Sequence, residues 1–145
     1  GETGFGVNFS GYEGLSVSFA TNDVETSVAA SSGDNTVMKA SYAFGPVTLA
    51  YSVSEEDTDT TSKSGESTSY SVAYSITDEF SIEYGSETHE QDDKSVDAEL
   101  DGISASFTTG GMTISASMID GENLDYSTSS AADVEFYSLG ASFAF

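Results

Sequence analysis

Apolar and small polar residues alternate along nearly the whole chain, with a period of two. The alternating segments are 5–9, 15–19, 38–44, 47–53, 70–76, 80–84, 103–107, 112–118 and 137–145. Successive side chains of a strand point to opposite faces, so each segment predicts a strand with one apolar and one polar face. A helical period fits none of these segments. The pattern therefore predicts an all-β protein of about nine strands.

Two kinds of connection alternate between these segments. The short ones, 11–14, 45–46, 77–79 and 108–111, carry turn residues and include the single proline, Pro46. The long ones, about 20–36, 54–67, 87–99 and 119–133, hold most of the acidic residues. Short turns at one end and long polar loops at the other predict an antiparallel up-and-down meander. We expect the strands themselves to be nearly free of charge.

The alternation alone does not say which face meets water. In a soluble sandwich or lipocalin-like barrel the apolar face points inward, whereas in a membrane barrel it faces lipid. The second face here is mostly Ser, Thr, Gly and Ala, unlike the Lys/Glu mixture of a soluble surface. Aromatic residues also gather beside the short turns, where an interfacial girdle would lie. The candidates for this girdle are Phe9, Phe44, Phe80 and Phe107. Both features favour a transmembrane β-barrel.

Charge and composition exclude several other classes of protein. The formal net charge is −22, from 25 acidic residues against three Lys and Arg together. Such a surface repels nucleic acid, because phosphate binding needs basic residues. There is no Cys, so no disulfide framework and no thiolate site. The aromatic residues, 12% of the chain, recur at alternate positions, which argues against disorder.

The last residues resemble the C-terminal signal of outer-membrane β-barrels. Ser138, Gly140, Phe143 and Phe145 match it position by position, with hydrophobic residues at alternate positions and a terminal aromatic. Segments 41–52 and 104–117 resemble hairpins of Gram-negative outer-membrane general porins, especially the alphaproteobacterial type. This resemblance covers nearly the whole chain, more in pattern than in identity.

The resemblance implies a location, a function and partners. It implies a water-filled channel in the bacterial outer membrane, embedded in lipid and open to passive diffusion of small hydrophilic solutes and ions. It also implies a homotrimer, and a last strand that the β-barrel assembly machinery reads. No enzyme activity and no nucleic-acid partner are expected.

Two features depart from the porin pattern. The resemblance to general porins implies a barrel of roughly 16 strands, whereas about nine strands are counted here. We therefore interpret residues 1–145 as a single porin β-barrel domain that lacks N-terminal strands. The cluster of basic wall residues typical of the porin constriction is also unrecognisable in this sequence.

Lys39 and Glu83 are the charges that the pattern places on the polar face within strands. We expect both to face the lumen. With such acidic loops, the vestibule should favour cations.

Metal and catalytic sites have weak support in the sequence. Asp120, Glu122 and Asp125 could hold Ca²⁺ in a loop, but they lack the EF-hand spacing. His89 lies in a stretch that is interpreted as a solvated acidic loop, and it has no recognisable Ser or Cys partner for a triad. No other cofactor is expected.

Two alternatives to a channel remain open. One is a small outer-membrane barrel that acts as an anchor or adhesin without transport. The other is an acidic, secreted, soluble β-protein. Extraction by detergent separates the second from the membrane proteins, and single-channel conductance separates the first from a porin.

Overall fold

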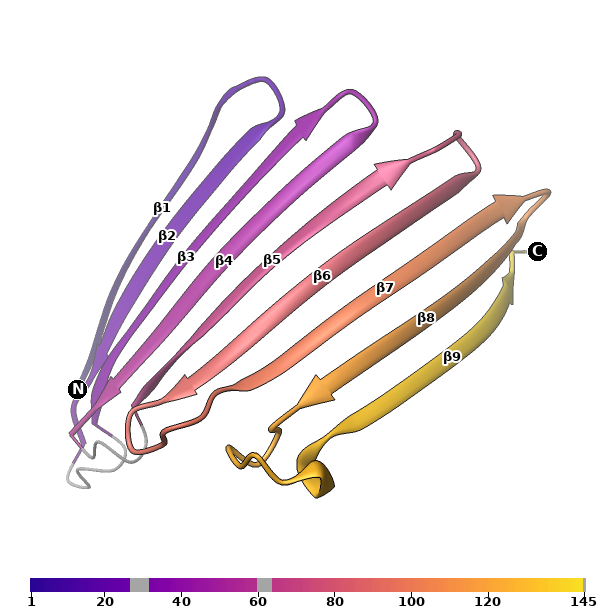
Figure 1. The fold of residues 1–145 in the computed structure, drawn as a ribbon. Helices are drawn as coiled ribbons and strands as arrows, with labels where there is room; N and C mark the ends of the chain where they lie inside the picture. Colours follow the sequence, from indigo (N-terminus) through magenta and orange to yellow (C-terminus); the bar gives the residue numbers. More distant parts are fainter. Residues whose placement is uncertain (27–31, 60–63, 145) are drawn as a thin grey trace.

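The computed structural model describes residues 1–26, 32–59 and 64–144, which form one nine-stranded antiparallel sheet. Its strands follow each other in chain order, each paired with the next (Figure 1). They are β1 Glu2–Tyr12, β2 Leu15–Val24, β3 Gly33–Phe44, β4 Val47–Thr58, β5 Gly65–Ser75, β6 Phe80–Gln91, β7 Ala98–Thr109, β8 Met112–Glu122 and β9 Val134–Phe143. A 3₁₀ turn, η3 Ser130–Ala132, precedes β9. The predicted all-β, up-and-down meander is confirmed.

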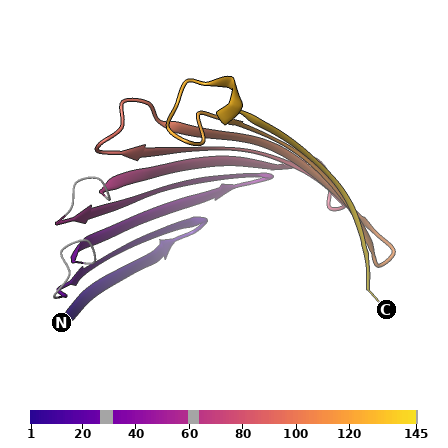
Figure 2. The ribbon, with the colours of Figure 1, turned by 90° about the horizontal axis from the view of Figure 1, so that it is seen from below.

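The sheet is a single curved layer. Seen from below, it forms an arch, with the two ends of the chain at its opposite edges (Figure 2). The edge strands β1 and β9 have one neighbour each, so the sheet is open in this structure. No helix in the described ranges is long and apolar enough to cross a membrane.

Register keeps the alternating apolar side chains of neighbouring strands on one face of the sheet, although Val37, Leu100, Ile119 and Phe136 lie on the other face. Tyr51 pairs with Ala40 on one side and Tyr70 on the other, so the apolar parity of β3, β4 and β5 coincides. The same holds across Tyr84, Ile103 and Met118 in β6, β7 and β8. Near the long loops, the positions on this face carry acidic side chains instead of apolar ones. The arch therefore has a convex face with the predicted apolar parity and a concave face with the Ser-, Thr- and Gly-rich parity.

The apolar face is not covered by protein. Among the described residues, the only buried hydrophobic side chains are Ala98 and Ala132. Large apolar side chains stay open instead, with Leu139 81% and Phe44 71% exposed. A soluble sandwich hides such a face under a second layer. The described part of the chain has no second layer, so it has no hydrophobic core of its own.

The strands extend further than the sequence pattern predicted. β4 continues to Thr58, β6 continues to Gln91 and β8 continues to Glu122, all within the predicted loops 54–67, 87–99 and 119–133. The expectation that charge is confined to loops is therefore wrong. Ladder hydrogen bonds between backbone groups do not require apolar side chains, so pairing continues where the apolar alternation stops.

Two long connections are fixed at their bases by the same contacts. The buried hydroxyl of Ser32 accepts a hydrogen bond from the Thr26 backbone N–H at 2.9 Å and donates to the Thr26 carbonyl at 3.2 Å. Ser64 makes the same pair of bonds to Thr58, at 2.9 and 3.3 Å. These two Thr–Ser latches hold the strand ends at which the long loops begin and end.

Candidate functional site: the concave wall

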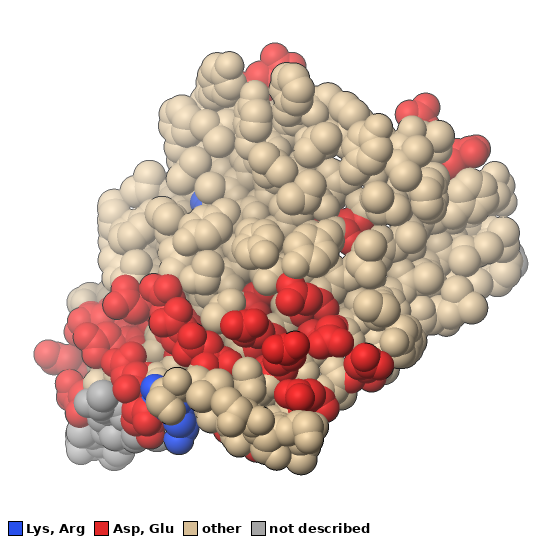
Figure 3. Space-filling model, viewed as in Figure 1, with Lys and Arg blue, Asp and Glu red and all other residues tan. Residues whose placement is uncertain are grey.

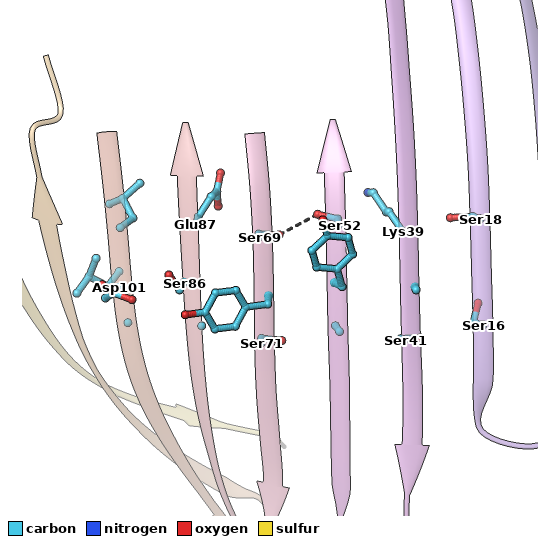
Figure 4. A pocket seen from close by; sticks show the side chains of 18 residues that line it. Ser16, Ser18, Lys39, Ser41, Ser52, Ser69, Ser71, Ser86, Glu87 and Asp101 are labelled. Atoms are coloured by element: carbon cyan, nitrogen blue, oxygen red, sulfur yellow. Dashed lines mark hydrogen bonds between the residues drawn. The ribbon is translucent and has the colours of Figure 1, made fainter. Parts of the chain in front are cut away.

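A hollow of about 740 Å³ lies on the concave face. Its lining repeats one kind of side chain over neighbouring strands, as Figure 4 shows. The lining serines of the concave parity are Ser16, Ser18, Ser41, Ser52, Ser69 and Ser71, joined by Lys39 and Glu87; Ser86 and Asp101, which belong to the convex parity, also border the hollow. Hydroxyls of Ser52 and Ser69 hydrogen-bond across β4 and β5 at 2.8 Å. Small hydroxyl side chains leave space and offer both donors and acceptors, which suits a hydrated wall.

The two charges that the sequence singled out lie on this face, but apart from each other. Lys39 on β3 stands between its register partners Ser18 and Ser52 and lines the hollow. Glu83 on β6 pairs with Ala73 and Ser104, nearer the short turns, and is not among the lining residues. Both side chains are exposed. The structure does not bring Lys39 and Glu83 together.

A hydrogen-bonded chain of three side chains was missed by sequence reasoning. His89 Nε2 lies 2.7 Å from Glu87 Oε1, and His89 Nδ1 lies 2.7 Å from Ser67 Oγ. All three belong to the concave parity, His89 and Ser67 being direct register partners. The signal that could have found it is the parity of Glu83, which continues through Glu87 to His89. It was overlooked because 87–99 was interpreted as loop.

The arrangement of Ser67, His89 and Glu87 resembles a hydrolytic triad only in composition. A triad needs free N–H donors for the oxyanion beside the nucleophile. Ser67 lies inside the sheet, paired with Ser54 on one side and His89 on the other. Backbone N–H groups there donate to the ladders, so none is left to stabilise an oxyanion.

The convex face divides into two regions along the strands. Toward the short turns it is apolar. Toward the long loops, the same parity carries eleven acidic residues, which we call the acidic border. Its members are Asp23, Asp34, Glu55, Asp57, Glu66, Glu90, Glu99, Asp101, Asp120, Glu122 and Glu135. Acidic side chains accordingly form a band at the long-loop end of this face (Figure 3).

Tyrosines stand where the apolar region meets the acidic border. Tyr84 donates to Asp101 at 2.6 Å, and Tyr137 donates to Glu135 at 3.3 Å. Tyrosine combines an apolar ring with a polar tip, which is the pattern of membrane–water boundaries. The position of these tyrosines fits the edge of a hydrocarbon layer at this junction.

The four predicted girdle residues lie on the convex face near the short turns. Phe80 and Phe107 are register partners across β6 and β7. Phe44 pairs with Val47 at the β3–β4 turn and stacks on Tyr42, with ring centroids 6.5 Å apart. Phe9 precedes an irregularity in the β1–β2 register. The four side chains thus share one face and one end of the sheet.

Three residues of the C-terminal motif lie on β9. Ser138 hydrogen-bonds Ser117 at 2.7 Å on the concave side. Gly140 lies opposite Ser115, and Phe143 lies opposite Met112 on the convex side. Phe145 falls outside the described residues.

The three Ca²⁺ candidates do not form a pocket. Asp120 and Glu122 lie on the convex face of β8, and Asp125 follows in the connection to η3. In the part of the chain that the structure describes, no three His, Cys, Asp or Glu residues gather in a way that could hold a metal ion. The loop site predicted from the sequence therefore gains no support.

Comparisons with known proteins agree with this architecture. A family model described as Gram-negative porin matches residues 1–145. A solved porin structure, refined at 1.8 Å resolution, superposes with a TM-score of 0.75 at 18% sequence identity. The match covers 95% of this chain and 50% of that porin, so the chain spans about half its length. At this identity the likeness shows the fold alone. No curated protein matches the chain.

Proposed function

The chain belongs to the Gram-negative porin family, a family of outer-membrane channel proteins, and on this premise we propose that it forms part of a water-filled channel. The channel would admit small hydrophilic solutes and ions by passive diffusion. Its wall is the concave face. Its lipid surface is the part of the convex face between the short turns and the acidic border.

The observation that carries this proposal is the contrast between the two faces of one layer. Large apolar side chains on the convex face are exposed, and the described chain offers nothing to cover them. The opposite face presents serine hydroxyls and the charges of Lys39 and Glu87 around a hollow, which Asp101 also borders. A layer that is apolar outside and polar inside fits a barrel that separates lipid from water.

The free edges support a larger barrel with further strands. β1 begins opposite Val24 at the long-loop end, and β9 ends opposite Met112 at the short-turn end. Both edge strands therefore run in the same direction. Closing the sheet with antiparallel neighbours requires an odd number of additional strands, and seven would give roughly 16.

Partners follow from the same premise. We infer a homotrimer in outer-membrane lipid, inserted by the β-barrel assembly machinery through the C-terminal motif. Deleting Phe145 should impair insertion in cells and leave refolding in detergent nearly intact. Normal insertion would make this residue an ordinary aromatic, and poor refolding would make it structural.

Cation preference is a further part of the proposal. It is supported by the net charge of −22 and by the acidic side chains at the long-loop end. A negative entrance concentrates cations and repels anions.

Planar-bilayer recording of the intact protein tests both parts. We expect stepwise ohmic conductance, and a reversal potential in a KCl gradient that shows K⁺ passing more readily than Cl⁻. A folded, detergent-soluble protein without conductance would instead support an anchor or adhesin. Conductance with anion preference would place the control of selectivity outside the described residues.

A further inference from the structure

We propose that His89, held between Glu87 and Ser67, makes the ion selectivity of the pore respond to pH. This inference rests on the proposed channel function of the concave wall. His89 is the only histidine of the chain, and it contacts both neighbours at 2.7 Å. Glu87 lines the hollow, so a change in its partner's charge is felt where ions pass.

The contacts allow a proton to be added without moving heavy atoms. With a neutral ring, Nε2–H donates to the Glu87 carboxylate, and Nδ1 accepts from the Ser67 hydroxyl. After proton uptake, Nδ1–H donates to the Ser67 oxygen, whose own hydrogen turns elsewhere, because a hydroxyl can act in either role. Both states keep the two hydrogen bonds. The Ser67 hydroxyl can therefore hydrogen-bond the His89 ring both before and after protonation.

Few other charges face His89 across the sheet. On β5 the concave positions beside it are Gly65, Ser67 and Ser69, and on β7 they are Ala98 and Leu100, none of which titrates. On its own strand the facing neighbours are Glu87 and Gln91. Glu56 lies on β4, two strands away. The β6–β7 connection carries Asp92, Asp93, Lys94 and Asp97, and Lys94 Nζ lies 3.5 Å from Asp93. Glu87 is thus the charge that His89 directly offsets.

The direction of the effect follows from counting charge. With neutral His89 the pair contributes one negative charge to the wall, and with protonated His89 it contributes none. Side-chain exposures of 33% for His89 and 46% for Glu87 keep the pair open to the water of the pore. Imidazole is the side chain whose charge ordinarily changes between about pH 5 and 8. Proton uptake by His89 should therefore weaken the preference for K⁺ over Cl⁻.

The test compares the intact porin with its His89→Gln variant in planar bilayers. The K⁺/Cl⁻ permeability ratio is measured at pH 8 and pH 5 in dilute KCl, because salt screens single charges. Glutamine retains an amide that can donate to Glu87 but does not titrate. From pH 8 to pH 5 the K⁺/Cl⁻ permeability ratio should fall in both proteins, and the fold-decrease in the parent should be about twice that in the variant. His89→Gln keeps every carboxylate of the parent, so this variant also controls for the titration of the acidic side chains.

A second measurement does not depend on the variant folding. Nuclear magnetic resonance of the intact parent with labelled histidine gives the midpoint of imidazole titration, assigned to His89. This midpoint should coincide with the midpoint of the selectivity change. Equal falls in parent and variant, or midpoints that differ, would overturn the role of His89 while the channel stands. A folded parent without conductance at either pH would overturn the proposed channel function itself.

Discussion

The two halves of the convex face differ although the same strands build both. On β7 and β8, Phe107 lies opposite Ile114 near the short turn, whereas Asp101 lies opposite Asp120 toward the long loops. Backbone pairing, side-chain parity and sheet curvature are continuous between these pairs. Only the side chains change, so the difference records a change in the surroundings of the sheet.

The position of the change matches the thickness of a membrane. Eight residue steps separate Met112 from Asp120 on β8, or roughly 26 Å along the strand, and a tilt of about 40° reduces this to about 20 Å of height. The apolar band of outer-membrane barrels is about 25 Å tall. We infer that the acidic border lies where the convex face leaves the hydrocarbon layer, with the strand ends on its long-loop side in water or among headgroups.

The largest expected effect comes from placing a charge on the apolar half of the convex face. Val72→Arg should destabilise the intact protein by about 2–4 kcal/mol, because an arginine near the bilayer midplane loses its hydration. Ser71→Arg, on the concave side of the same strand, is the matched control and should cost much less. Urea unfolding in lipid vesicles measures both. Equal costs for the two variants would contradict the assignment of the faces.

The next contrast keeps the face and changes the height. Ala116→Arg and Asp120→Arg lie on the convex side of β8, four residues apart. We expect a cost of about 2–4 kcal/mol for the first and about 0–1 kcal/mol for the second, because charge becomes tolerable near the interface. The same unfolding assay applies. If Asp120→Arg is as costly as Ala116→Arg, the acidic border does not mark the membrane boundary.

A smaller effect is expected at the strand end that the Thr58–Ser64 hydrogen bonds hold. Ser64 is 3% exposed and bonds both backbone groups of Thr58. Ser64→Ala should cost about 1–2 kcal/mol, as for a lost hydrogen bond at a buried site. Hydrogen exchange at the Thr58 amide should accelerate, whereas Ser71→Ala on the concave wall should leave it unchanged. An unaltered exchange rate would show that the Thr–Ser latch does not hold this strand end.

The smallest change in stability is expected on the concave wall. Lys39→Gln removes an exposed charge and should alter the free energy of unfolding by no more than about 0.5 kcal/mol. Because Lys39 lines the hollow, its loss should raise the K⁺/Cl⁻ permeability ratio. Reversal potentials of parent and variant provide the measurement. A lowered ratio would show that Lys39 does not act on passing ions.

The strand pattern was predictable because strand parity has a period of two and leaves a direct mark in the sequence. Segments such as 47–53 and 112–118 alternate cleanly, and both lie within strands of the structure. The short turn at Pro46 was equally clear, since proline and glycine interrupt pairing.

The strand ends on the long-loop side could not be predicted in the same way. Beyond Val53 and Met118 the positions on the convex face become acidic, so the apolar alternation disappears although pairing continues to Thr58 and Glu122. This loss of signal also concealed the contact of His89 with Ser67, which depends on the register of β5 against β6. The spacing of residues along the sequence does not show that Ser67 and His89, which are 22 residues apart, lie opposite each other on neighbouring strands.

Spin labelling along β4 tests most directly the claim that the convex face meets lipid up to the acidic border. The chain has no Cys, so single cysteines can be placed one at a time at positions 48 to 57 of the intact protein in bilayers. Collisions with oxygen, which concentrates in lipid, should peak at Leu49, Tyr51 and Val53. Collisions with a water-soluble nickel complex should peak at Thr48, Ala50 and Ser52, and from Glu55 onward should dominate on both faces. Water accessibility at Leu49, Tyr51 and Val53 equal to that of their neighbours would contradict the account.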